Sequence, residues 1–190
     1  FERIDRNIRV DGLNRSYSLF VPRGASRSRE WPLIVGFHPA FAQAVWMERE
    51  AGFQTAPGSQ DFVIAYPDGI RRAWNAGDCC GAPHRRNIDD IAFYRAMVQD
   101  IGTIVPVDDI FLTGFSNGAR MVYHILCRAP QGITAAAPLG ATRDMSGCAD
   151  SRVPLLHIHG TEDDASPAMG GTLSGLGKGI GYISPAPEVV

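Results

Sequence analysis

The chain has 190 residues and a mass of 20.6 kDa, which is typical of one domain with its own hydrophobic core. Hydrophobic residues make up 45% of it and charged residues 20%, and 18 Lys and Arg against 20 Asp and Glu give a formal net charge of −2. This balance predicts no nucleic-acid partner and no membrane partner, and the apolar runs are too short to span a bilayer. Because no basic, apolar leader begins the chain, we expect any signal peptide to have been removed.

The sequence predicts strands at its N-terminal end and at several places further along the chain. Residues 7–22 favour two strands on either side of Asp11-Gly12, a dipeptide suited to a hairpin turn. Short apolar runs then recur along the chain and end at turn residues or glycines. These runs are Pro32–Phe37, Phe62–Tyr66, Asp109–Phe115, Ile133–Leu139 and Val153–Ile158. Unbroken apolar runs of this length are typical of strands buried on both faces of a parallel sheet.

Two segments between these runs have the spacing of amphipathic helices. The first is expected to start at Asn87 as N-cap, with Asp89 and Asp90 in its first turn, and the second to start near Asn117. The apolar faces consist of Ile91, Tyr94, Met97, Val98 and Ile101 in the first helix, and of Met121, Val122, Ile125 and Leu126 in the second. The alternation predicts an α/β fold, a mainly parallel twisted sheet with helices on both faces. No repeat or linker divides residues 1–190, so we treat them as one domain.

A nucleophile motif lies between a predicted strand and a predicted helix. Gly114-Phe115-Ser116-Asn117-Gly118 matches G-x-S-x-G, directly after the run that ends at Phe115. A strand, a sharp turn and a helix are what a nucleophile elbow needs, and the helix start directs backbone N–H groups at a developing oxyanion. The alternative is a glycine-rich turn with an incidental serine. We expect Ser116 to be a catalytic nucleophile.

A serine nucleophile needs a base and an orienting carboxylate, in the chain order serine, acid, histidine for this kind of turn. Three carboxylates follow the run that ends at Ile158, namely Glu162, Asp163 and Asp164. A solvated acidic loop explains at least two of them, and spacing alone does not choose among the three.

Taken in order, the motifs resemble the secreted esterase family that holds polyhydroxybutyrate depolymerases and feruloyl and acetylxylan esterases, within the α/β-hydrolase superfamily. The resemblance covers essentially the whole chain. It rests on 11–17 (DGLNRSY), Val21-Pro22, 66–69 (YPDG), 74–77 (WNAG), Cys79-Cys80-Gly81, 89–93 (DDIAF), the elbow, 159–163 (HGTED), Pro167 and Gly170-Gly171. It implies an α/β-hydrolase fold without cofactor or metal, and Asp163 as the triad acid.

The resemblance also suggests the remaining site residues. The oxyanion would be held by the backbone N–H of Asn117 and by a second N–H from the loop after Phe37. The family usually carries His-Gly there, whereas this chain has His38-Pro39, and proline has no N–H, so Ala40 becomes the expected second donor. Trp74 and Phe41, with Trp46, are candidates for an aromatic substrate wall, although ordinary core or surface positions explain each of them equally well.

No triad histidine is found in the sequence. The family carries it near the C-terminus, but none of the five histidines follows Gly160. His38 and His159 are expected to support loops, His157 to be a hydrogen-bonded core residue, and His124 to point away from the elbow. His84 lies in a basic loop that could reach the site. We therefore expect a domain that is C-terminally incomplete and lacks the last strand and helix, with the base supplied by a C-terminal fragment or a second chain.

Four cysteines leave the redox state open between buried thiols and disulfides. Cys127–Cys148 would close a loop, and the adjacent Cys79–Cys80 would form a vicinal bridge; both pairs are favoured, and bridges would indicate a secreted protein. Within the family that the chain resembles, the adjacent cysteines favour a serine esterase acting on feruloyl or acetylxylan esters of plant polysaccharides. The alternatives are a polyhydroxybutyrate (polyester) depolymerase and a non-catalytic binding module on the same scaffold.

Overall fold

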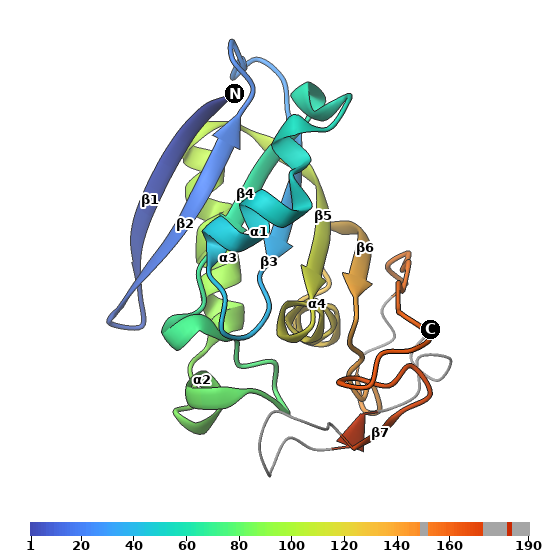
Figure 1. The fold of residues 1–190 in the computed structure, drawn as a ribbon. Coiled ribbons are helices and arrows are strands. Elements are labelled where there is room, and N and C mark those ends of the chain that lie inside the picture. The colour runs from blue at the N-terminus through green and yellow to red at the C-terminus, as the bar shows by residue number, and fades with distance from the viewer. Residues whose placement is uncertain (149–151, 173–181, 184–190) are drawn as a thin grey trace.

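A six-stranded sheet forms the centre of the computed structural model, which describes residues 1–148, 152–172 and 182–183 (Figure 1). The strands are β1 (Glu2–Val10), β2 (Leu13–Val21), β3 (Trp31–Phe37), β4 (Val63–Pro67), β5 (Val107–Phe115) and β6 (Ile133–Leu139). Their order in the sheet is β1-β2-β4-β3-β5-β6, with β1 and β2 antiparallel to their neighbours and the other pairs parallel. The predicted hairpin and the mainly parallel sheet are both confirmed.

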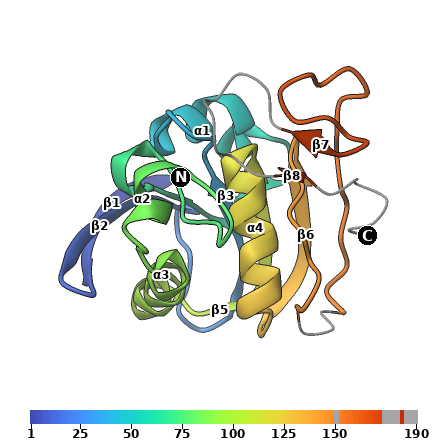
Figure 2. The ribbon, with the colours of Figure 1, turned by 90° about the horizontal axis from the view of Figure 1, so that it is seen from below.

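Helices cover both faces of this sheet, as predicted. They are α1 (Ala44–Ala51), α2 (Gly81–Arg85), α3 (Asp90–Ile104) and α4 (Asn117–Arg128), with short 3₁₀ turns η1 (Phe53–Thr55), η2 (Ser59–Asp61) and η3 (Ile70–Arg72). The main core lies between the sheet and α3 and α4, where Met97, Ile101 and Met121 are fully buried. A second core of Ala44 and Met47 from α1 packs on the opposite face (Figure 2).

Helix α3, the first of the two predicted helices, begins two residues later than predicted. The N-cap of α3 is Asp89, whose carboxylate accepts a hydrogen bond from the Ala92 N–H at 2.8 Å. Asn87 instead has a left-handed backbone with a φ of 48°. A carboxylate at the N-cap satisfies a helix N–H and lies at the positive end of the helix dipole, so it competes well with asparagine.

One prediction near the C-terminal end of the sequence needs correction. Residues 153–158 do not form a named strand; they pair with β6 through two isolated parallel bridges, Ala136–Leu155 and Leu139–Ile158. Further along the chain, β7 (Gly171–Thr172) pairs with β8 (Tyr182–Ile183) in a small antiparallel sheet. Residues 173–181 lie outside the described residues.

The cysteine pairs are the ones that the sequence analysis favours. Cys127, in the last turn of α4, is bonded to Cys148 with a Cα–Cα distance of 4.8 Å, and Cys79 is bonded to Cys80. In the part of the chain that the structure describes, no helix is long and apolar enough to cross a membrane.

An open apolar groove of about 910 Å³ lies on the α1 face, over β5 and β6. Trp46, Phe62 and Phe111 line it, and Trp46 stacks on Phe115 with a distance of 6.0 Å between ring centroids. Trp46 therefore belongs to this groove and is absent from the pocket that contains Ser116.

Candidate active site

Ser116 lies at the sharp turn between β5 and α4, at the carboxyl end of the central parallel strands. Its backbone has a φ of 55° and a ψ of −116°, which is a strained conformation for a residue with a side chain. The Ser116 N–H donates to the Leu139 carbonyl at 2.9 Å and so fixes the turn to the end of β6. Among the hydrogen bonds of the described residues, none involves the Ser116 hydroxyl. Ser116 lines a pocket of about 630 Å³.

The two glycines of the motif are required by close packing. A Cβ on Gly114 would lie 2.5 Å from the Gly118 carbonyl oxygen, and a Cβ on Gly118 would lie 2.1 Å from the Phe37 carbonyl oxygen. The start of α4 therefore touches the ends of both β5 and β3. Any side chain at either glycine would push the helix away from the strands and move Ser116.

Both predicted oxyanion donors line the same pocket as Ser116. Asn117 is the first residue of α4, where the backbone N–H has no carbonyl within the helix to bond to. The loop that carries Ala40 is held by the Phe41 N–H, which donates to the Arg72 carbonyl at 2.8 Å. Among the described residues, no hydrogen bond is formed by the Ala40 N–H. Two N–H groups therefore remain available at this pocket.

Asp163 lines this pocket from the loop after residue 158. Its Oδ1 accepts hydrogen bonds from the Ala165 and Ser166 N–H groups at 3.0 and 2.9 Å, and its Oδ2 lies 3.5 Å from His159 Nε2. These contacts hold the carboxylate with Oδ2 near Gly140, the residue directly after β6. Of the three candidate triad acids, Asp163 lines the Ser116 pocket, whereas Glu162 and Asp164 do not line it.

The two aromatic candidates have different positions. Phe41 is 66% exposed and lines the pocket, with a left-handed φ of 66°. Trp74 does not reach the pocket: it is fully buried, packs edge-on against Phe37, and its indole N–H donates to the His38 carbonyl at 2.9 Å. The expectation that Trp74 contacts substrate is therefore corrected, since this large ring fills the core beneath the site.

The histidines largely keep the roles predicted for them. His38 is fully buried; its Nε2 accepts from the Gly69 N–H at 2.9 Å and its Nδ1 donates to the Pro39 carbonyl at 2.8 Å. Burial lowers the pKa of His38, so the ring is neutral.

His124 packs beside Gly77 and lies outside the Ser116 pocket. His84, in α2, lines that pocket, with its Nδ1 3.3 Å from Asn75 Oδ1.

A chain of ring hydrogen bonds, not foreseen from the sequence, supports the Asp163 loop. The Tyr123 hydroxyl donates to His157 Nδ1 at 2.8 Å, and His157 Nε2 donates to His159 Nδ1 at 2.9 Å. His159 Nε2 then donates to the Ser166 carbonyl at 2.5 Å. Both nitrogens of each ring are thus used in hydrogen bonds, and burial together with His159 lowers the pKa of His157. The pattern His-x-His is the only sequence signal for this arrangement.

Arg120 is a second feature of the pocket that the sequence analysis missed. It lies one helical turn after Ser116, and its backbone N–H donates to the Ser116 carbonyl at 3.0 Å. Its side chain is only 4% exposed, and its Nη2 donates to Asp78 Oδ2 at 3.2 Å. Burial lowers the pKa of this guanidinium from its usual value, an effect that Asp78 opposes. An arginine at helical spacing from the serine is the signal that could have found it.

Comparison with solved structures defines the fold. A thermostable esterase superposes on 87% of the chain with a TM-score of 0.73, 18% identity and 48% of its own chain covered. A poly(3-hydroxybutyrate) depolymerase from Bordetella parapertussis superposes on 86% of the chain with a TM-score of 0.63, 15% identity and 67% of its chain covered. These similarities establish the α/β-hydrolase fold.

Sequence comparison finds related esterases. No family model matches the chain. In an alignment of 164 positions that covers 79% of the chain, it is 31% identical to feruloyl esterase B of Piromyces equi, of which it covers 29%. The chain is similar in sequence to feruloyl esterases and has the α/β-hydrolase fold. This α/β-hydrolase spans between 22% and 60% of the lengths of five curated relatives that it matches.

Residues 1–148, 152–172 and 182–183 contain no group of three or more His, Cys, Asp or Glu side chains able to hold a metal ion. The pocket of the α/β-hydrolase thus combines an unbonded serine hydroxyl, two backbone donors and a fixed carboxylate, a set suited to acyl transfer.

Proposed function

We propose that the chain carries the nucleophile, the triad acid and the oxyanion donors of a serine carboxylic-ester hydrolase. The observation that carries this proposal is the strained turn at Ser116, which lines the same pocket as Ala40 and as Asn117 at the start of α4. A turn that stores strain while exposing a nucleophile next to oxyanion donors is a costly arrangement with a direct catalytic use.

The proposed reaction passes through an acyl-enzyme. Ser116 Oγ attacks the ester carbonyl carbon and gives its proton to a histidine, and the N–H groups of Asn117 and Ala40 stabilise the oxyanion. The ester C–O bond then breaks, and the histidine returns the proton to the leaving alcohol. Water hydrolyses the acyl-enzyme by the same route in reverse. Asp163 would hold the histidine and stabilise its positive charge.

The histidine base is proposed to come from outside these 190 residues, from a C-terminal fragment or a second chain. The positions of the present histidines support this, because His38, His157 and His159 use both ring nitrogens in hydrogen bonds. For residues 1–190 alone, we expect turnover lower by on the order of 10⁴–10⁶ than in a complete triad enzyme. His84 is the alternative base, since it lines the pocket.

The proposal is tested with the intact protein, p-nitrophenyl acetate and a fluorophosphonate probe. We expect Ser116 to be labelled, and turnover to be lost in Ser116→Ala and strongly reduced in Asp163→Asn. An unlabelled Ser116 in the intact protein would favour a non-catalytic binding module. His84→Gln is expected to keep turnover; its loss, or full activity of residues 1–190, would identify an in-chain base.

Feruloyl or acetylxylan esters of plant polysaccharides are the proposed substrates. The similarity to feruloyl esterase B supports this choice, and the exposed ring of Phe41 at the pocket offers a surface for a phenolic acyl group or a sugar. Turnover of methyl ferulate and acetylated xylan is expected to exceed that of short polyhydroxybutyrate oligomers. The opposite preference would favour the polyester depolymerase alternative.

Secretion is proposed for the same protein. Both cysteine pairs are bonded, and disulfides persist in oxidising compartments. Protein isolated without reductant is expected to show no free thiol when unfolded in the presence of a thiol reagent. Four free thiols would contradict this assignment.

A further inference from the structure

The pocket beside Ser116 is positively charged, although the chain as a whole has a net charge of −2. Four arginines and two aspartates line it. The arginines are Arg71, Arg72, Arg85 and Arg120, and the aspartates are Asp78 and Asp163. A concave site with an excess of one sign of charge raises the local concentration of ions of the opposite sign. An ester with a second, anionic group would gain affinity here that a neutral ester would not.

Arg120 is the buried centre of this charge. Its side chain is 4% exposed, and two of its three guanidinium nitrogens, Nε and Nη1, are buried without a hydrogen-bond partner among the described residues. Guanidinium groups stay protonated in proteins, so the charge remains even though burial disfavours it. Charge in a poorly solvated position acts on the pocket more strongly than charge in water.

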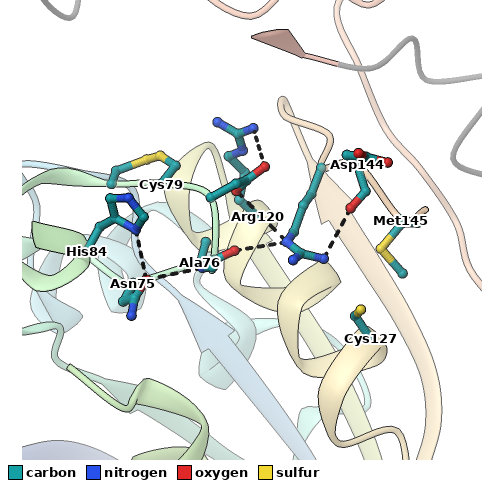
Figure 3. Close-up of polar contacts among 12 residues, drawn as sticks. Asn75, Ala76, Cys79, His84, Arg120, Cys127, Asp144 and Met145 are labelled. Carbon is teal, nitrogen blue, oxygen red and sulfur yellow. Dashed lines mark hydrogen bonds and ion pairs between the residues drawn. A yellow bond between two sulfur atoms is a disulfide. The ribbon is translucent and has the colours of Figure 1, made fainter. Parts of the chain in front are cut away.

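The carboxylate of Asp78 does not neutralise this position. Asp78 is 38% exposed and is shared, because Arg120 Nη2 lies 3.2 Å from its Oδ2 and Arg143 Nε lies 3.9 Å from its Oδ1. Arg143 also donates to the Ala76 carbonyl at 3.0 Å. Figure 3 shows Arg120 between the loop that carries Ala76 and Cys79 and the segment that carries Asp144. The guanidinium groups of Arg120 and Arg143 thus share the half-exposed carboxylate of Asp78.

The rim adds further positive charge at fixed positions. Arg71 and Arg72 have consecutive left-handed backbones, with φ values of 53° and 62°. The Arg72 carbonyl accepts the hydrogen bond from the Phe41 N–H, and the Arg72 N–H donates to the Gly69 carbonyl at 3.0 Å. This tie links the arginines to the loop of the second oxyanion donor, Ala40. The strain is maintained at the pocket, which is where strained backbone usually serves function.

We propose that this pocket binds esters that carry a carboxylate near the ester bond, with the charge of Arg120 as the buried attraction and Arg71 and Arg72 as contacts at the rim. Guanidinium groups match the planar carboxylate in shape and charge. The carboxylate belongs either to the acyl part or to the alcohol part of the ester, for example a dicarboxylic acid monoester or an ester of an acidic alcohol. That the bound ester is cleaved rests on the function proposed above; the binding of its carboxylate does not.

Binding to the Ser116→Ala variant of the intact protein tests this without requiring catalysis. One ligand pair is monomethyl glutarate against dimethyl glutarate, with the charge on the acyl side. The other is 4-carboxyphenyl acetate against 4-carbamoylphenyl acetate, with the charge on the alcohol side. By titration calorimetry at low salt, we expect the charged member of at least one pair to bind roughly tenfold more tightly, and this preference to shrink at high salt because of screening. The pair that responds identifies the side of the ester.

Substitutions then assign the preference to the pocket. We expect Arg120→Met to reduce it to less than about threefold, and Arg72→Gln to reduce it in part. Should Arg120→Met fail to fold, the double variant Arg71→Gln with Arg72→Gln at the exposed rim is expected to reduce the preference for the charged ligand in the same way. Arg9→Gln, at an exposed position of β1 that does not line the pocket, is the matched control and is expected to leave it unchanged.

Two results would overturn the proposal: equal binding of charged and neutral ligands in both pairs, or a preference that survives the pocket substitutions. Neither depends on the nucleophile. Failure of the proposed function would be seen separately, as an unlabelled Ser116 in the fluorophosphonate experiment.

Discussion

The side-chain amide of Asn117 forms hydrogen bonds with both the backbone N–H and the backbone carbonyl of Trp74. The Asn117 Oδ1 accepts from the Trp74 N–H at 2.8 Å, and its Nδ2 donates to the Trp74 carbonyl at 3.1 Å. Both residues are buried, so these bonds fasten the segment before the Cys79–Cys80 loop to the first turn of α4. The residue whose backbone is proposed to bind the oxyanion therefore uses its side chain to assemble the pocket wall.

Replacing this amide is expected to destabilise the protein. Asn117→Ala leaves the buried Trp74 N–H without an acceptor, and an orphaned buried group costs about 1–3 kcal/mol. Urea unfolding should report a loss of that size in the free energy of unfolding. Asn7→Ala, at an exposed position of β1, is the control and should change it by less than about 0.5 kcal/mol. Equal stability of the two variants would contradict the role assigned to the amide.

Gly118 has no space for a side chain. Gly118→Ala places a methyl group against the Phe37 carbonyl, so α4 must move from β3, at a cost of about 2–3 kcal/mol and with slower fluorophosphonate labelling of Ser116. Gly102→Ala is the matched control in α3, where nothing lies within 4 Å of the added Cβ. This control is expected to gain about 0.5–1 kcal/mol from helix propensity. Thermal unfolding that ranks the two variants in the opposite order would refute the packing argument.

A buried ion pair connects β2 to α3. Arg15 Nη2 lies 2.6 Å from Asp90 Oδ1, both side chains are nearly inaccessible, and the guanidinium lies 3.8 Å from the centre of the Phe93 ring. Arg15→Met leaves the Asp90 carboxylate buried and unpaired, so we expect a loss of about 3–5 kcal/mol by denaturant unfolding.

The exposed pair Arg49–Glu50 provides the comparison. Its side chains are 73% and 46% exposed, and Arg49→Met should cost less than about 1 kcal/mol. Adding Asp90→Leu to Arg15→Met should recover part of the loss, because the unpaired charge is then removed. A double variant less stable than Arg15→Met alone would contradict this explanation.

Acidification is expected to destabilise the fold through its histidines. Burial lowers the pKa of His38 and His157, and burial with the nearby Arg143 lowers the pKa of His124 to about 4. The unfolded chain binds these protons below its ordinary histidine pKa of about 6.5, whereas the folded chain does not. The free energy of unfolding should therefore fall as pH decreases from about 6.5 toward 4.

Urea unfolding at pH 7.5 and pH 5 measures this effect. We expect a smaller decrease in His124→Gln than in the parent protein, because one of the linked protons has been removed. An equal decrease in both proteins would exclude His124 from the linkage.

The sequence alone determined the local structure, including the turn that carries Ser116. Continuous apolar runs predicted β3 to β6, the hairpin dipeptide predicted β1 and β2, and helical spacing predicted α3 and α4, because these patterns act over a few residues. The sequence Gly114 to Gly118 identified the turn at Ser116 for the same reason. Family resemblance selected Asp163, and the structure brings that carboxylate to the Ser116 pocket.

Tertiary structure decided what each side chain contacts, since contacts between distant segments leave no short-range pattern. Tryptophan is a residue type that often binds ligands, yet Trp74 packs beneath the site and lies in the core. Arg120 reads as an ordinary helix arginine, yet the chain fold buries it beside Asp78 and next to the pocket. The length and composition predict one domain with a net charge of −2; only the fold brings four arginines to the pocket that Ser116 lines.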